Sequence, residues 1–140
     1  MTILVDTNVW SLALRRDAVA DEPEVQALKD ALLGAEVIVT TGLVLQELLQ
    51  GFSGPKAQAQ IVERFEALPL IQPDRVDHVG AAEIRNLCRR AGVQIGTIDA
   101  LLAQLCIRHE LTLLTTDKDF VHAALHFPLA VWPARAQVKP

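Results

Sequence analysis

Short apolar segments alternate along the chain with longer amphipathic stretches. The short segments have the composition and length of buried strands, at 3–6, 37–40, 70–71, 112–115 and 129–131. Between them the pattern predicts helices at 7–15, 23–33, 42–51, 56–67, 75–91, 97–109 and 118–125. Short strands that alternate with helices are typical of an α/β fold, in which a parallel sheet is covered by helices on both sides.

Turn residues support these boundaries, because Gly34 and the stretch from Gly51 to Pro55 fall between predicted elements. A chain of 140 residues that is 51% hydrophobic fits one globular domain with a sizeable core. We therefore expect a single domain over residues 1–132, followed by a frayed tail at 133–140.

Several classes of protein are disfavoured by composition. No window has the roughly 18–20 uninterrupted apolar residues of a membrane span, and the N-terminus lacks the pattern of a signal peptide, so we expect a cytoplasmic protein without a membrane partner. Cys88 and Cys106 lack CxxC spacing and are expected to be buried, reduced thiols.

The net charge of −4 does not by itself indicate a nucleic-acid partner. Arg85, Arg89 and Arg90, however, could share one flank of the helix predicted at 75–91. Arg85 and Arg89 are therefore candidates for contacts with RNA phosphates, although a solvated helix face would explain them equally well.

Four acidic residues stand where the predicted strands end or the next helices begin. Asp6 ends the first strand, Glu47 interrupts the apolar run GLVLQELLQGF, Asp99 opens the helix TIDALLAQLCI, and Asp117 follows the strand LTLLTT. In a parallel sheet the carboxyl ends of all strands lie along one edge, where ligands bind in this architecture. We therefore expect these four side chains to gather at that edge.

Each acid also has an ordinary structural explanation. Asp6 could cap the helix that follows it, and Asp99 and Asp117 suit the first turn of a helix through the helix dipole. Glu47 could lie at a polar edge beside Gln46 and Gln50. These explanations weaken when the four acids are taken together, because four separate coincidences would have to fall on one edge.

Clustered carboxylates repel one another unless protons or a cation lie between them. Oxygen ligands without His or Cys favour a hard ion, Mg²⁺ or Mn²⁺. Such an ion can activate water and neutralise the charge of a phosphate, so the pattern suggests hydrolysis of phosphodiester bonds. Asp119 is either an additional metal ligand or an exposed acid of the next helix.

Hydroxyl and amide side chains near these acids could orient the carboxylates. Asn8, Thr115 and Thr116 are the main candidates for this supporting role. Thr7 and Thr97 are weaker candidates, because threonine is an ordinary residue at helix starts and strand ends.

The acids and their flanking residues resemble the motifs of PIN-domain proteins, in particular the VapC toxins of type II toxin–antitoxin systems. The matching stretches are VDTNVW around Asp6, QELLQG around Glu47, GTIDALLA around Asp99 and LLTTDKDF around Asp117 and Asp119. The four motifs come in the family's order and spacing, and the resemblance covers essentially the whole chain.

The resemblance implies a single PIN domain, a three-layer α/β/α sandwich around a parallel sheet of about five strands. It also implies a Mg²⁺- or Mn²⁺-dependent endoribonuclease that cuts tRNA, rRNA or mRNA and so inhibits translation. Asp6, Glu47, Asp99 and Asp117 would form the metal-binding catalytic set, with Asp119 present in only some relatives. The implied partners are a cognate VapB antitoxin, a second copy of the chain in a homodimer, and a larger toxin–antitoxin complex.

Three other functions compete with this one. A phosphatase of the haloacid dehalogenase type needs a second Asp two residues after the first, where this chain has Asn8. A receiver-like module needs a late lysine at a strand end, and Lys118 instead follows Asp117. A PIN domain that serves only as a protein-binding scaffold would not need the full set of acids.

Overall fold

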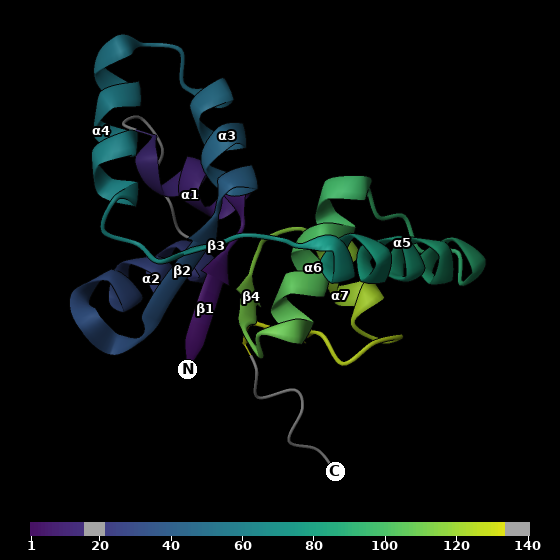
Figure 1. Ribbon diagram of the computed structural model, residues 1–140. Helices are drawn as coiled ribbons and strands as arrows, with labels where there is room; N and C mark the ends of the chain where they lie inside the picture. The colour runs from purple at the N-terminus through teal and green to yellow at the C-terminus, as the bar shows by residue number, and fades with distance from the viewer. Residues whose placement is uncertain (16–21, 134–140) are drawn as a thin grey trace.

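Five parallel strands form one central sheet in the computed structural model, which describes residues 1–15 and 22–133 (Figure 1). The strand order is β3-β2-β1-β4-β5, so the first strand lies in the middle of the sheet. Ile3 of β1 is paired with Ile38 of β2 on one side and with Thr112 of β4 on the other. The α/β class and the five predicted strands are confirmed. The strands are β1 Thr2–Val5, β2 Val37–Thr41, β3 Leu70–Ile71, β4 Thr112–Leu114 and β5 Ala130–Val131.

The helices form two groups, which are visible on either side of the strands in Figure 1. Helix α1 packs against α2 and α3, α3 packs against α4, and α5 packs along α6. Connections between parallel strands are right-handed, so those leading to β2 and β3 and those leading to β4 and β5 cover opposite faces. The helices are α1 Thr7–Leu14, α2 Pro23–Asp30, α3 Gly42–Gly51, α4 Pro55–Phe65, α5 Arg75–Arg90, α6 Thr97–Arg108 and α7 Lys118–Ala123, with a π-helical turn at Ala31–Ala35.

Several element boundaries differ from the prediction. The first strand ends at Val5 and the fourth at Leu114, one residue earlier than predicted in each case, and Asp6 is instead the N-cap of α1. The helix predicted at 23–33 is divided, since α2 passes into the π-helical turn, where Gly34 has a φ of 104°. The helix predicted at 118–125 ends at Ala123. Residues 134–140 of the predicted tail, like residues 16–21, lie outside the described part of the chain.

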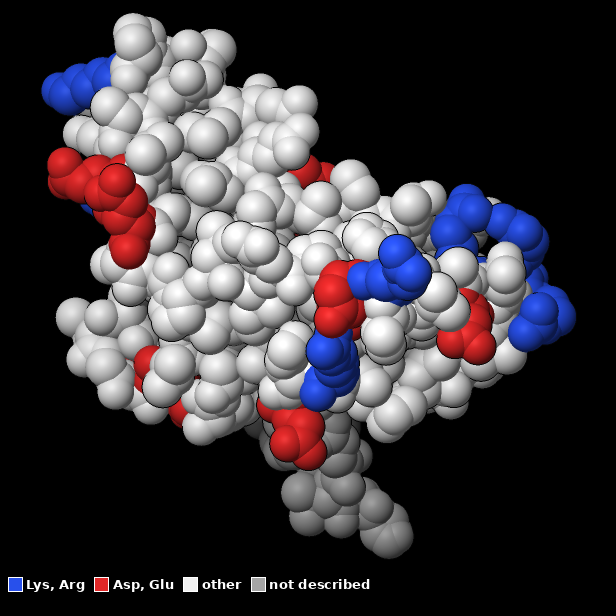
Figure 2. Space-filling model, in the orientation of Figure 1, with Lys and Arg blue, Asp and Glu red and all other residues white. Residues whose placement is uncertain are grey.

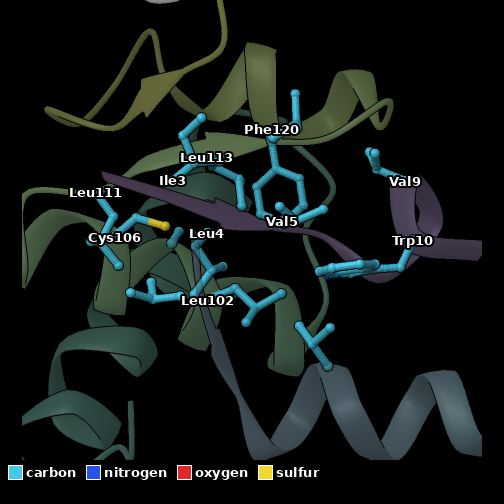
Figure 3. Packing of buried hydrophobic residues seen from close by; sticks show 14 of the residues in the cluster. Ile3, Leu4, Val5, Val9, Trp10, Leu102, Cys106, Leu111, Leu113 and Phe120 are labelled. Atoms are coloured by element: carbon cyan, nitrogen blue, oxygen red, sulfur yellow. The ribbon is translucent and has the colours of Figure 1, made fainter. Parts of the chain in front are cut away.

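The core is built around β1, whose Ile3, Leu4 and Val5 are almost completely buried (Figure 3). In the same view, side chains from α1, α6, β4 and α7 surround this strand. Trp10 of α1 is also buried, and the centroid of its ring lies 4.9 Å from the centroid of the Phe65 ring. The N-terminal helix therefore contributes to the core.

Both cysteines are buried and free of disulfide bonds, as the sequence predicted. Burial raises the pKa of the Cys88 and Cys106 thiols, which keeps them protonated and poorly nucleophilic. Within residues 1–15 and 22–133, no helix is both long and apolar enough to span a membrane.

The sheet has one point at which the direction of the connections reverses. The chain leaves β1 toward β2 and β3, and it returns to the other side of β1 with β4 and β5. Neighbouring strands whose connections diverge leave a crevice beyond their carboxyl ends, which is the usual ligand site of open α/β sheets. In this chain that point lies between the ends of β1 and β4, next to Asp6 and Thr115.

Candidate active site

Asp6 lies at the carboxyl end of β1 and is held on three sides. Its backbone N–H donates to the Leu114 carbonyl at 2.9 Å, which joins the ends of β1 and β4. Its Oδ1 accepts from the Thr7 backbone N–H at 2.8 Å, and its Oδ2 accepts from the Thr115 hydroxyl at 2.8 Å. Asp6 therefore caps α1, as the structural explanation proposed, and also presents a fixed carboxylate at the strand end.

Burial raises the pKa of Asp6, and the nearby charges of Glu47 and Asp117 raise it further. The hydrogen bonds from Thr115 and Thr7 act in the opposite direction, because they stabilise the ionised carboxylate. The residue is only 6% exposed, so its charge has little stabilisation from water. A buried carboxylate with acidic neighbours would be stabilised by a cation.

Glu47 reaches the same end of the sheet from α3. This helix starts directly after β2, where the Thr41 hydroxyl caps it by accepting from the Val44 N–H at 3.2 Å. Glu47 is half-buried, and its Oε1 accepts from the Thr7 hydroxyl at 2.9 Å. Thr7 thus connects Glu47 to the segment that carries Asp6.

Asp117 and Asp119 stand at the start of α7, just beyond β4. Asp117 caps this helix, since its Oδ1 accepts from the Asp119 N–H at 2.9 Å. Its own N–H donates to the Thr115 hydroxyl oxygen at 3.0 Å. One threonine hydroxyl therefore contacts both the Asp6 carboxylate and the backbone of Asp117, and it spans the reversal point of the sheet.

Asn8 ties α1 to the loop after β4. Its Oδ1 accepts from the Thr116 N–H at 3.4 Å, and its Nδ2 donates to the Thr115 hydroxyl at 3.5 Å. Of the three supporting residues predicted, Asn8 and Thr115 contribute side chains to this network, and Thr116 contributes its backbone N–H. No hydrogen bond of the Thr116 hydroxyl occurs in the described ranges.

Asp99 comes from the first turn of α6, whose N-cap is Gly96. Burial raises the pKa of Asp99 to about 6, with further contributions from Asp6, Asp117, Glu47 and Asp119. The five predicted acids are therefore close enough to act on one another electrostatically. They come from four separate segments of the chain, so the fold assembles this group.

The acidic cluster, meaning Asp6, Glu47, Asp99, Asp117 and Asp119, does not form a finished coordination sphere. Within residues 1–15 and 22–133, no group of three or more His, Cys, Asp or Glu side chains is arranged to hold a metal ion directly. The donor set nevertheless fits a hard divalent cation, because it consists of carboxylates, and burial together with the neighbouring negative charges raises the pKa of Asp6 and of Asp99.

The two predicted RNA-contacting arginines come from α5, a helix that carries none of the five acids. Arg85 and Arg89 stand near the C-terminal end of α5, and the loop of residues 91–96 separates that end from α6. Arg85 uses its Nε to donate to the Ile95 carbonyl at 3.2 Å. The structure therefore places these arginines at a second location, which is considered below.

Thr7 is the site residue that the sequence analysis ranked too low, as one of the weaker candidates for a supporting role. Its hydroxyl donates to Glu47, although the two residues are 40 positions apart. A threonine directly after a helix-capping aspartate is too common to indicate such a contact. The only available signal was its position inside the VDTNVW motif.

The sequence of this chain matches a domain family and is similar to known proteins. The family model for the PIN domain matches residues 3–125. The ribonuclease VapC11 of Mycobacterium tuberculosis is 30% identical over 120 residues, which cover 84% of this chain and 88% of that protein. A VapC ribonuclease of Mycobacterium bovis is similar to the same extent.

Solved structures of similar fold come from bacterial complexes. FitAcB from Neisseria gonorrhoeae has a TM-score of 0.71 and 27% identity, covering 92% of this chain and 95% of that one. VapBC2 from Rickettsia felis, solved bound to a DNA fragment from their promoter, has a TM-score of 0.71, 21% identity and coverage of 94% and 97%. The second similarity supports the fold alone.

Proposed function

The chain belongs to the PIN-domain family, and from this premise we propose that it is a Mg²⁺- or Mn²⁺-dependent endoribonuclease, the toxin of a type II toxin–antitoxin pair. The family assignment is supported by the match over residues 3–125 and by the VapC relatives at 30% identity. The substrate would be a cellular RNA, whether tRNA, rRNA or mRNA, and its cleavage would inhibit translation.

One observation carries the proposal: burial and the charges of acids from other segments raise the pKa of Asp6 and of Asp99, while the hydroxyls of Thr7 and Thr115 donate to Glu47 and Asp6 at the ends of β1 and β4. Asp6 is the centre of this arrangement, since it is buried and takes a hydrogen bond from Thr115 across the reversal point of the sheet. A protein without a cationic ligand would gain nothing from such repulsion.

The residues of the site would have different roles in binding the cation. Asp6, Glu47, Asp99 and Asp117 would hold the cation, and Asp119 would add a further carboxylate. Thr7, Asn8 and Thr115 would fix the orientation of the acids through the hydrogen bonds described above. When bound, Mg²⁺ or Mn²⁺ supplies an activated water and neutralises charge on the scissile phosphate.

The partner follows from the same family relationship. The similar solved structures include FitAcB, FitAB and VapBC assemblies, some of them bound to DNA. We accordingly assign to this chain a VapB-type antitoxin that neutralises it, a homodimeric state, and a larger toxin–antitoxin complex. A protein that acts on cellular RNA would work in the cytoplasm.

The proposal is tested by incubating the purified chain, freed of any antitoxin, with total cellular RNA. We expect discrete cleavage products in Mg²⁺ or Mn²⁺ and none in EDTA. The variant Asp6→Asn should lose at least about 100-fold in rate, because electrostatic groups at such centres contribute on that order. The matched control is Asp30→Asn, which changes an exposed aspartate of α2 and should cleave like the unmodified chain.

Two results would contradict the proposal. Cleavage that continues in EDTA or in Asp6→Asn would mean a contaminating nuclease or a different chemistry. Intact RNA under all conditions, despite measurable binding of Mn²⁺, would favour a PIN domain that acts only as a binding scaffold. Induced expression in bacteria gives an independent readout, in which protein synthesis should stop with the unmodified chain and continue with Asp6→Asn.

A further inference from the structure

A small hollow lies at the C-terminal end of α5, apart from the acidic cluster. It has a volume of about 220 Å³ and is lined by Arg85, Arg89, Gly92, Val93, Gln94 and Ile95. We call it the arginine hollow. Among the residues that the structure describes, no acidic side chain lines it, so two guanidinium groups and a stretch of backbone define its chemistry.

The backbone around the arginine hollow is held firmly. Helix α5 ends in a Schellman motif, in which the Val93 N–H donates to the Cys88 carbonyl at 2.8 Å and the Gly92 N–H donates to the Arg89 carbonyl at 3.2 Å. Gly92 has a φ of 78°, a conformation that glycine adopts without strain. The loop therefore forms a defined wall.

Arg85 is fixed against this wall. Its Nε donates to the Ile95 carbonyl at 3.2 Å, and the side chain is half-buried. Among residues 1–15 and 22–133, its two terminal nitrogens have no hydrogen-bond or ion-pair partner. An anchored guanidinium with free donors is suited to bind an anion, because little conformational entropy is lost on binding.

The arginines at this end of the molecule are not neutralised by neighbouring acids. The ion pairs within the described ranges involve the N-terminus and Arg108, and none involves Arg85, Arg89 or Arg90. Figure 2 shows basic side chains gathered where α5 ends. Since the net charge of the chain is −4, this local excess of positive charge is a distinct feature. It would attract a polyanion to one end of an otherwise acidic protein.

The arginine hollow is connected to the acidic cluster by a short path. Its wall continues directly into Gly96 and Thr97, where α6 begins, and Asp99 lies in the first turn of that helix. RNA carries a phosphate at every nucleotide. One strand can therefore place one phosphate at the acidic cluster and another phosphate, some nucleotides away, in the arginine hollow.

We propose that the arginine hollow binds a backbone phosphate of the RNA chain, with Arg85 and Arg89 as the contacting residues. This inference rests on the proposed ribonuclease function and adds a substrate-binding subsite to it. Binding of a phosphate there, in addition to one at the acids, would fix the direction and register of the RNA without selecting particular bases. A competing explanation is that the arginines only stabilise the C-terminal end of the α5 dipole.

The test compares Arg89→Ala with Arg90→Ala in the full-length chain. Both residues are exposed, both lie in the last turn of α5, and both changes remove one positive charge, but only Arg89 lines the hollow. The probe is a fluorescein-labelled, single-stranded oligoribonucleotide of mixed sequence. Its dissociation constant is measured by fluorescence anisotropy in EDTA, so that neither cleavage nor metal contributes.

We expect Arg89→Ala to weaken binding by about three- to tenfold and to lower the salt dependence of log Kd by about 0.7, the value for one lost phosphate contact on single-stranded RNA. Arg90→Ala should weaken binding less than about twofold. The variant Arg89→Lys should recover part of the affinity, because lysine keeps the charge but not the planar fork.

Equal losses in the two alanine variants would overturn the subsite and leave only general attraction or the helix dipole. Failure of the unmodified chain to bind the oligoribonucleotide would overturn it as well. The two proposals remain separable. If the chain cleaves RNA and the two alanine substitutions weaken RNA binding equally, only the subsite is rejected. If Arg89→Ala weakens binding selectively but the chain cleaves no RNA, only the ribonuclease activity is rejected.

Discussion

Asp6 combines two tasks that the sequence presented as alternatives. One carboxylate oxygen caps α1 through Thr7, and the other takes the hydroxyl of Thr115 at the end of β4. An aspartate at a strand end can therefore cap a helix and also be a candidate metal ligand, because its two carboxylate oxygens contact different partners.

The balance between these tasks predicts opposite effects of Asp6→Asn on stability and on metal binding. Without metal, the variant should be as stable as the unmodified chain or more stable, because a buried charge beside Glu47 and Asp117 is removed while the cap to Thr7 can remain. Mn²⁺ at about 100 times its Kd should raise the free energy of unfolding of the unmodified chain by about 2.7 kcal/mol. It should not stabilise Asp6→Asn.

Urea unfolding with and without Mn²⁺ measures both effects. A strongly destabilised metal-free variant would mean that Asp6 serves mainly as a structural cap. Equal stabilisation of both proteins by Mn²⁺ would place the metal elsewhere.

Thr115 is expected to support metal binding through its hydroxyl. Thr115→Val keeps the shape of the side chain but removes the donor to Asp6 and the acceptor for Asp117. Affinity for Mn²⁺, measured by calorimetry, should fall by about 10- to 100-fold, the usual effect of losing a group that orients a ligand. Stability should fall by about 1–3 kcal/mol, since buried polar partners lose a hydrogen bond.

Thr40→Val is the matched control for this substitution. Thr40 of β2 is fully buried, and its hydroxyl has no hydrogen-bond partner among the described residues. The same change there should leave Mn²⁺ affinity unchanged and should be neutral or stabilising by about 1 kcal/mol. A loss of affinity in both variants would point to a general distortion of the sheet.

The sequence identified which residues could act but not how they are connected. The positions of Asp6, Asp99 and Asp117 at strand ends and helix starts, and of Glu47 inside the helix after the second strand, followed from hydrophobic periodicity. The contact of Thr7 with Glu47 and that of Thr115 with Asp6 join residues 40 and 109 positions apart, and no local pattern encodes them.

At the scale of elements, the start of α5 is fixed to the end of α6. Asp74 and Asp77 form a capping box at the N-terminus of α5, and Arg108 of α6 contacts Asp77 at 2.7 Å and Asp74 at 3.0 Å. The Asp77 side chain is fully buried, whereas those of Arg108 and Asp74 are 39% and 54% exposed. The link holds the helix that carries the arginine hollow against the helix that carries Asp99.

This link predicts a loss of stability in acid. Burial alone would raise the pKa of Asp77, but hydrogen bonds from the Asp74 N–H and from Arg108, together with the charge of Arg108, outweigh it and lower the pKa. The pKa of Asp77 is thus lower in the folded chain than in the unfolded chain, where an aspartate has a pKa of about 3.9. The ionised Asp77 therefore stabilises the fold fully above that pH, and this stabilisation is lost as the pH falls through the lower pKa of the folded chain. The free energy of unfolding should therefore decline below about pH 4.

Asp77→Asn should remove this contribution. At pH 7 it should cost about 1–3 kcal/mol, and its stability should decline less steeply in acid. Asp74→Asn is the control, because asparagine still caps a helix and the exposed pair with Arg108 contributes less than about 1 kcal/mol. Urea unfolding at pH values from 7 to 3 would disprove the role of Asp77 if both variants followed the unmodified chain in parallel.

Element types were predictable from the sequence, while their ends were not in every case. The strand at 70–71 was marked by Pro69 and Pro73, and β3 has these bounds. The predicted helix at 23–33 was divided because the turn at Gly34 depends on how the chain enters β2, which periodicity does not register. Trp10 is buried through a contact with Phe65 of α4, and periodicity within α1 alone does not identify that partner.

At the scale of the whole molecule, we expect two chains to associate. The family relationship implies a homodimer, and α5 exposes Val76 and Val79, which are 63% and 58% accessible in the single chain. Light scattering coupled to size-exclusion chromatography should give twice the mass of one chain. A single-chain mass at every concentration tested would contradict this expectation.

The placement of β1 in the middle of the sheet has a consequence for how the protein is made. Asp6 is synthesised before the strand β4 and before its hydrogen-bond partner Thr115, which lies 109 positions later in the chain. Pairing between segments so distant in sequence waits until both are available. A growing polypeptide that lacks β4 cannot bring Asp6 and Asp117 together, so the proposed metal centre would form only after the segment that follows β4 has been synthesised.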